Sequence, residues 1–124
     1  MLFRSAAGAM TGFSYAEALI ACVRAWQTDG YEAARDALLP YLPLINFEQQ
    51  ARIALPVRKE CLRQRGLIAD AGVRAPGAPF PELLRPSMLN HLAESAAALD
   101  ARSSAPTAAT SPVTTAALTT VGSF

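Results

Sequence analysis

Few side chains in this chain could support nucleophilic or general acid–base chemistry. Lys59 is the only lysine and His91 the only histidine. A lysine that forms a Schiff base must be neutral near pH 7, whereas Lys59 lies between Arg58 and Glu60 on a predicted helix rich in charge. We interpret it as a structural or surface lysine. His91 falls within a predicted helix with no nucleophile placed near it, so we interpret it as a surface histidine rather than a catalytic base.

The paired carboxylates and the two cysteines also do not indicate a catalytic or metal-binding site. Glu32 and Asp36 lie one helical turn apart, but with Arg35 beside them they have the pattern of a solvated helix face. Cys22 and Cys61 are far apart and show no CxxC spacing, so the sequence predicts neither a zinc site nor a disulfide framework. We expect both to be buried apolar thiols, and we expect no metal or other cofactor.

A basic edge, defined as Arg58, Lys59, Arg63 and Arg65, could contact phosphate, RNA or an acidic partner. Cations near a helix C-terminus are, however, favoured by the helix dipole. We therefore favour a solvated face, and an RNA-binding helical module stays open as a weaker alternative.

Composition fits one modest domain. The chain has 124 residues, of which 52% are hydrophobic, but many of these are alanines that bury little surface. The net charge of +1 provides no overall field for nucleic acid or anionic lipid. No apolar stretch is long enough for a membrane helix and no signal sequence is visible, so we expect a cytoplasmic protein without a membrane partner.

The elements that position these residues are mainly helices. Ser14 followed by Glu17 predicts a capping box, and Gly30 predicts the end of that first helix. Its expected buried stripe is Leu19, Cys22, Val23 and Trp26.

A second helical pattern runs from Tyr31 to about Gln50. Pro40 and Pro43 predict a kink or break near residues 39–42, because each removes a helical hydrogen bond. The expected buried residues are Ala34, Ala37, Leu38, Tyr41, Leu42 and Ile45.

Two further helices follow. Pro56 suits the first turn of the third helix and Gly66 its end. An extended connector over 73–81 precedes a last helix over about 86–101. The expected inward residues are Val57, Cys61 and Leu62 in the third helix and Met88, Leu92 and Leu99 in the last.

Neither end of the chain has the helical pattern of the residues between them. Residues 1–5 match a translated sequencing adapter, so we expect a foreign leader and a true protein that continues upstream. The glycine-punctuated residues 6–13 suit one strand end and a turn. Residues 102–124 are expected to form a disordered tail, because they are rich in Ala, Thr and Ser without an apolar period.

An ordered series of short motifs resembles the end of the dihydrodipicolinate synthase and N-acetylneuraminate lyase family. The resemblance covers about residues 6–101, the last third of a typical member. Its motifs are Gly8-Ala9-Met10-Thr11-Gly12, Gly30-Tyr31-Glu32-Ala33-Ala34, Leu55-Pro56-Val57-Arg58-Lys59, Gly66-Leu67-Ile68 and Arg74-Ala75-Pro76 followed by Pro79. The stretches Met10–Phe13 and Phe47–Gln50 look more like the sugar-acid and keto-acid branch.

The resemblance implies the last strand and C-terminal helices of a TIM (β/α)₈ barrel, which leaves this fragment mainly α. It implies a homo-oligomeric parent, a lyase or dehydratase that binds pyruvate or another 2-oxo or sugar acid through a lysine Schiff base. The catalytic lysine, the tyrosine and the carboxylate-binding loop belong to missing upstream strands. What carries over is Gly8, Ala9, Met10 and Thr11, the segment that lines the pyruvyl pocket with its backbone. The same four residues fit a plain strand-to-helix turn without a binding role equally well.

The expected function is therefore that of a catalytically incomplete lyase fragment. The alternative is a small helical interaction module without enzymatic activity, whose apolar faces bind a protein partner.

Overall fold

The computed structural model describes residues 10–104, and every regular element within that range is a helix. In chain order these are α1 (Ala16–Asp29), α2 (Tyr31–Leu38), the 3₁₀ turn η1 (Leu39–Tyr41), α3 (Leu42–Glu48), α4 (Ala54–Gln64), the 3₁₀ turn η2 (Glu82–Leu84) and α5 (Arg85–Ser103). The mainly helical fold class is thus confirmed. Residues 10–13, the described part of the expected strand end, do not form a strand.

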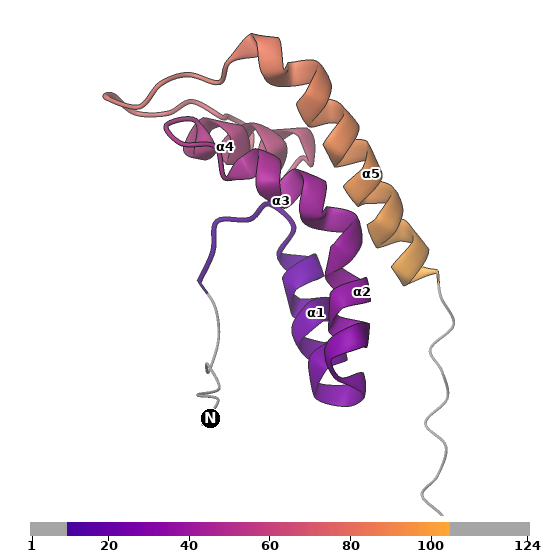
Figure 1. Ribbon diagram of the computed structural model, residues 1–124. Coiled ribbons are helices and arrows are strands. Elements are labelled where there is room, and N and C mark those ends of the chain that lie inside the picture. The colour runs from indigo at the N-terminus through magenta and orange to yellow at the C-terminus, as the bar shows by residue number, and fades with distance from the viewer. Residues whose placement is uncertain (1–9, 105–124) are drawn as a thin grey trace, which may run out of the picture.

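The helices form a hairpin and a second layer against its upper end (Figure 1). α1 and α2 lie side by side and run in opposite directions, and η1 and α3 continue the path of α2 toward α4. α5 descends beside α3 after a long connector. None of the helices in residues 10–104 is long and apolar enough to cross a membrane.

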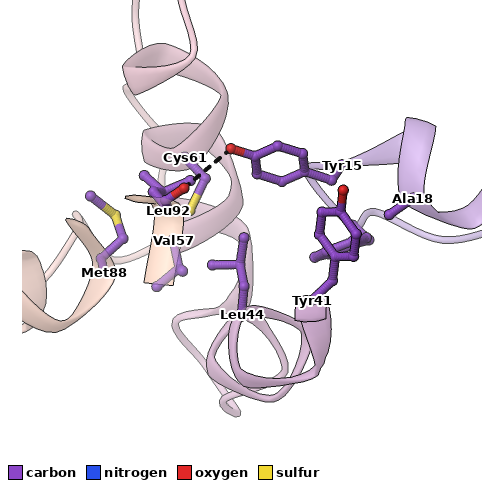
Figure 2. Packing of buried hydrophobic residues seen from close by; sticks show 9 residues of the cluster. Tyr15, Ala18, Tyr41, Leu44, Val57, Cys61, Met88 and Leu92 are labelled. Carbon is purple, nitrogen blue, oxygen red and sulfur yellow. Dashed lines mark hydrogen bonds between the residues drawn. The ribbon is translucent and has the colours of Figure 1, made fainter. Parts of the chain in front are cut away.

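The core lies where residues preceding α1 meet η1, α3, α4 and α5 (Figure 2). Its fully buried centre consists of Tyr41, Leu44, Val57, Cys61 and Met88. Tyr15 reaches across from the N-terminal side and donates its hydroxyl hydrogen bond to the carbonyl oxygen of Leu92 at 3.4 Å. This single contact links two segments 77 residues apart in the chain.

The predicted capping box at α1 is wrong. α1 begins at Ala16, its N-cap residue is Tyr15, and no side chain caps it. The hydroxyl of Ser14 instead donates to Glu48, and the carboxylate of Glu17 accepts from Arg65 at 2.7 Å. The side chains of Ser14 and Glu17, which the local pattern predicted to cap the first helical turn, thus bind residues distant in the chain.

The predicted buried stripe of α1 is also largely wrong. Val23 and Trp26 expose 56% and 58% of their surface, and the one fully buried residue of the helix is Ala18. Leu19 packs against the core as a partly buried residue. α1 contacts mainly α2. Of the expected stripe, Leu19 and Cys22 are partly buried, and Val23 and Trp26 are exposed.

The predicted break near Pro40 is confirmed. α2 ends at Leu38, and the turn η1, with Pro40 in its centre, redirects the chain into α3. Of the expected buried residues, Ala34, Ala37 and Tyr41 are buried, Leu38 and Ile45 are partly buried and Leu42 is exposed. The new turn shifts the helical phase, so Leu44 takes the core position instead of Leu42.

α4 agrees closely with its predicted limits. Pro56 lies in its first turn and is buried, and Val57 and Cys61 face the core, while Leu62 is partly buried. Gly66 follows the helix with φ +73°, and its N–H donates to the carbonyl oxygen of Arg63 at 2.9 Å. A glycine suits this positive φ because other residues adopt it at a cost.

The connector and last helix were predicted well. Residues 66–81 contain no regular element, and α5 buries Met88 and Leu92, with Leu99 partly buried. α5 reaches Ser103, so its end includes two residues that the sequence assigned to the tail. Residues 105–124 and 1–9, with the predicted leader, lie outside the described residues.

Candidate functional site

The predicted substrate-binding segment is described only in its second half. Gly8 and Ala9 lie outside the described residues. Met10 is fully exposed, and Thr11 is exposed with its hydroxyl oxygen accepting a hydrogen bond from the N–H of Phe13 at 3.3 Å. Met10 and Thr11 therefore lie at the surface, and their two side chains do not form a pocket with each other.

The residues that follow are firmly anchored. Phe13, Ser14 and Tyr15 are buried, and Ser14 donates its backbone N–H to Oε2 of Glu48 at 3.2 Å. The Ser14 hydroxyl donates to the other carboxylate oxygen, Oε1. Arg65 donates to the carbonyl oxygen of Ser14 and places its guanidinium 3.8 Å from the centre of the Tyr15 ring. The end of the segment is thus fixed against α3 and α4.

Glu48 is a fully buried carboxyl group at the C-terminal end of α3. Burial raises its pKa, and the hydrogen bonds from Ser14, the charge of Arg58 and a hydrogen bond with Cys61 oppose that rise. The same burial, with the nearby Glu48 carboxylate, raises the pKa of the Cys61 thiol to about 12. Cys61 is therefore a protonated, buried thiol and not a nucleophile, as the sequence predicted.

Arg58 closes this cluster on the outer side. Its Nε lies 3.8 Å from Oε2 of Glu48, and its Nη2 donates to Oε1 of Gln49 at 3.2 Å. The guanidinium also covers Gly12, where a Cβ would lie 2.9 Å from Nη1. A Cβ at residue 12 would therefore require the flexible end of the Arg58 side chain to shift.

A second buried carboxylate, Glu60, lies on the opposite side of α4. It accepts hydrogen bonds from Arg63 at 2.6 Å, from Gln64 at 2.8 Å and from Arg85 at 2.5 Å. These donors hold its pKa at about 2. Glu60 is thus permanently ionised near neutral pH and joins α4 to the start of α5, a structural rather than a proton-transferring role.

The structure gives Lys59 a structural contact. Its Nζ donates to the carbonyl oxygen of Gly72 in the connector, beside an open hollow that Leu55, Asp70 and Arg74 also line. The side chain is half-buried and no acid–base partner is hydrogen-bonded to its amine. This geometry agrees with the interpretation of Lys59 as structural.

His91 is half-buried rather than at the surface as predicted, whereas the carboxylate pair agrees with its prediction. The imidazole of His91 packs on the ring of Phe47, with centroids 5.2 Å apart, and its Nδ1 lies 3.9 Å from Glu94. Glu32 and Asp36 are exposed and flank Arg35 at 3.9 and 3.6 Å, as expected of a solvated face. Neither group faces a nucleophile.

The basic edge differs from its prediction. Arg58, Arg63 and Arg65 each make an ion pair with an acidic residue, and Lys59 is bonded to the connector. The four side chains point to intramolecular partners from different elements. Arg63 is exposed and its partner Glu60 lies on the same helix, as expected of a solvated face. Arg58, Lys59 and Arg65 are instead half-buried and contact α3, the connector and α1.

One feature that the sequence did not indicate is an apolar hollow between α1 and α2. It has a volume of about 440 Å³ and is lined by Cys22, Trp26, Tyr31, Ala34, Arg35, Leu38, Leu39 and Leu42. The rings of Trp26 and Tyr31 meet edge to face with centroids 6.3 Å apart. Cys22, expected to be buried, is only half-buried at this hollow. A helical-wheel inspection of both helices together could have indicated this shared face.

No group of three or more histidine, cysteine or acidic side chains in residues 10–104 could hold a metal ion. Comparison of the chain with protein-family models, with curated proteins and with solved structures gives no match.

Proposed function

We propose that this chain is the C-terminal end of a dihydrodipicolinate synthase family protein, a cytoplasmic Schiff-base lyase or dehydratase whose catalytic residues precede the present sequence. The intact protein would act on pyruvate or another 2-oxo or sugar acid. On this proposal α1 is the helix that follows the eighth barrel strand, and α2 to α5 are the additional C-terminal helices. The isolated chain is catalytically inactive.

The observation that carries the proposal is where the family-like motifs lie. Gly12 occupies the approach to α1, and Gly30, with φ +81° and ψ −158°, is the joint between α1 and α2. Leu55 and Pro56 fall in the first turn of α4 and Gly66 directly after its end. The Arg74 motif lies in the connector before α5. The first four motifs thus lie next to the ends of helices, whereas the Arg74 motif lies in the middle of the connector.

The anchored segment supports the same proposal. Ser14 donates two hydrogen bonds to Glu48 of α3, and the side chain of Arg58 from α4 lies against Gly12. A strand end that lines a binding pocket requires such rigid support from neighbouring elements. Here Glu48 provides such support to Ser14, which follows the predicted segment closely in the chain.

The experiment that tests this proposal is borohydride trapping. A lengthened protein, expressed from the intact upstream sequence, is incubated with pyruvate and reduced, and the product is mapped by mass spectrometry. We expect an adduct on a lysine upstream of the present chain. Unbroken genomic sequence that encodes residues 1–5 and no upstream reading frame would contradict the fragment assignment.

The alternative of a small helical interaction module is favoured by the apolar hollow between α1 and α2. Its lining includes four large apolar side chains that remain exposed, Trp26, Tyr31, Leu39 and Leu42. A stable, cooperative unfolding transition of the isolated chain would favour a complete domain of this kind.

A further inference from the structure

The carboxyl group of Glu48 connects α3 to the residues that precede α1. We call residues 13–15 the anchor segment; all three are buried. Oε2 of Glu48 accepts the backbone N–H of Ser14 at 3.2 Å, and Oε1 accepts the Ser14 hydroxyl. Both donors are neutral, and the carboxyl group itself has no exposed surface. The contact therefore places a titratable group in the interior without a cation among its Ser14 donors.

Two titratable groups of α4 also face this carboxyl group. Nε of Arg58 lies 3.8 Å from Oε2 of Glu48, which is too far for a hydrogen bond. The thiol of Cys61 is hydrogen-bonded to Glu48. The other buried acid of α4, Glu60, is bonded to Arg63 and so belongs to a separate cluster.

The charged groups of the remaining neighbours have partners of their own. Arg65, which follows α4, donates to the carbonyl oxygen of Ser14 and to Glu17 of α1. From α5, His91 places its Nδ1 3.9 Å from Glu94 of the same helix. Within residues 10–104, no cation is therefore hydrogen-bonded to the buried carboxyl group at the end of α3.

We propose that Glu48 is a pH-sensitive anchor, whose protonated carboxyl group holds the anchor segment in the core and whose ionisation releases it. The protonated group can still exchange hydrogen bonds with Ser14, because a serine hydroxyl both donates and accepts. An ionised carboxylate without water and without a bonded cation is disfavoured. Its place at the last residue of α3, beside the negative end of the helix dipole, disfavours the charge further.

The direction of the pH dependence follows from linkage. Burial raises the pKa of Glu48 above 4.5 in the closed state, although Ser14, Arg58 and Cys61 oppose the rise. Opening returns the group to water and to its ordinary pKa. The advantage of the closed state is therefore complete below pH 4.5 and is lost as the pH rises through the folded pKa. Within that interval the ratio of open to closed molecules rises by up to about tenfold per pH unit.

Opening of the anchor segment is a local event. Residues 13–15 contain no helix, so they leave the core without breaking a regular element. Local openings of this kind require less free energy than global unfolding. We therefore expect the amide of Ser14 to exchange with solvent through an opening that leaves α4 folded.

Amide hydrogen exchange of the full chain, followed by NMR from pH 4.5 to pH 8, tests the proposal. Protection factors remove the intrinsic pH dependence of exchange. We expect the Ser14 amide to be less protected than the Cys61 amide of α4 at every pH, and its protection to fall as the pH rises. A Ser14 amide as well protected as that of Cys61, or a protection factor independent of pH, would overturn the proposal.

Two variants identify the group that titrates. Glu48→Gln should keep the protection factor of Ser14 constant over this range. Glu60→Gln removes the other buried acid, whose pKa of about 2 lies below the range, so it should keep the wild-type fall. A fall that persists in Glu48→Gln, or that disappears in Glu60→Gln, would contradict the assignment.

A direct titration needs no variant. The carboxyl ¹³C shift of Glu48 in the wild-type chain should report a pKa above 4.5, and the fall in Ser14 protection should end near that pKa. A pKa at or below 4.5 would reject the proposal. This inference concerns described residues alone and does not rest on the proposed function, so neither the exchange experiment nor the trapping experiment decides the other.

Discussion

Ser14 gives both of its hydrogen-bond donors, the backbone N–H and the hydroxyl, to the carboxyl group of Glu48, which lies 34 residues later in the chain. Both residues are buried. This pair fixes the segment before α1 onto the end of α3. It also explains why the expected capping box does not form, because the serine hydroxyl is already engaged.

Replacing Ser14 by alanine should destabilise the protein. The substitution leaves a buried oxygen of Glu48 without its donor, which costs about 1–3 kcal/mol. Chemical denaturation measures this loss, and Ser87→Ala, at an exposed position in α5, serves as the control. Equal stability of the two variants would contradict a structural role for the Ser14 hydroxyl.

Glu48→Gln should change how stability depends on pH. Because the pKa of Glu48 is raised in the folded protein, the folded state holds this proton more tightly than the unfolded state. Its contribution is complete below the ordinary pKa of about 4.5 and is lost as the pH rises through the folded value. Wild-type protein should therefore lose stability relative to Glu48→Gln as the pH rises above 4.5. Parallel pH profiles in denaturant titrations would reject this account.

Glu60→Gln should show the opposite pH dependence. The pKa of Glu60 is lowered from 4.5 to about 2, so its ionised form stabilises the fold above pH 4.5 and that contribution is lost toward pH 2. At neutral pH we expect the variant to lose about 1–3 kcal/mol, since Arg63 and Arg85 lose their shared carboxylate. The two proteins should converge near pH 2. A constant difference down to that pH would show that the charge is not responsible.

Two glycines provide a ranked prediction. Gly30 and Gly66 both have positive φ, and a Cβ at either would meet no atom within 4 Å. The cost of alanine therefore comes from the backbone alone. Gly30, with φ +81° and ψ −158°, occupies a region accessible essentially to glycine only, so Gly30→Ala should cost about 1–3 kcal/mol. Gly66→Ala should cost less, about 1 kcal/mol. The reverse order in thermal melts would refute this assignment.

Two truncations distinguish the end of α5 from the tail. Arg102 donates from Nη1 to the carbonyl oxygen of Ala37 at 2.8 Å and so ties α5 to α2. A chain that ends at Ser104 should melt like the full chain, because the composition of residues 105–124 offers little apolar surface. A chain that ends at Ala101 should melt about 4–8 °C lower. Equal melting of all three would show that the Arg102 contact contributes nothing.

The sequence predicted well the features that depend on one or two neighbouring residues. Pro40 interrupts the second helix and Gly66 follows the end of α4. Both effects come from the backbone conformations that proline and glycine allow, which do not depend on distant residues. The start of α5 and most of its length followed from the helical pattern predicted over about residues 86–101, although the helix continues to Ser103.

Features that depend on distant partners could not be predicted in this way. The hydrophobic residues Val23 and Trp26 suit a core face by spacing, yet both are more than half exposed in the structure. The role of Glu48 required knowledge that α3 ends beside Ser14. In the candidate site, Gly12 lies against the Arg58 side chain, while the roles of Met10 and Thr11 remain predictions.

The most direct test of the proposed function compares the present chain with the upstream-extended protein in the same trapping reaction. Both are incubated with pyruvate, reduced with borohydride, digested and mapped by mass spectrometry. Lys59 donates to the carbonyl oxygen of Gly72 and has no acid–base partner hydrogen-bonded to its amine, so we predict no adduct on the present chain. We predict one adduct per extended protein, on an upstream lysine. A stoichiometric adduct on Lys59 would contradict the assignment of the catalytic lysine to upstream sequence, and an extended protein that traps no 2-oxo acid would contradict the Schiff-base mechanism.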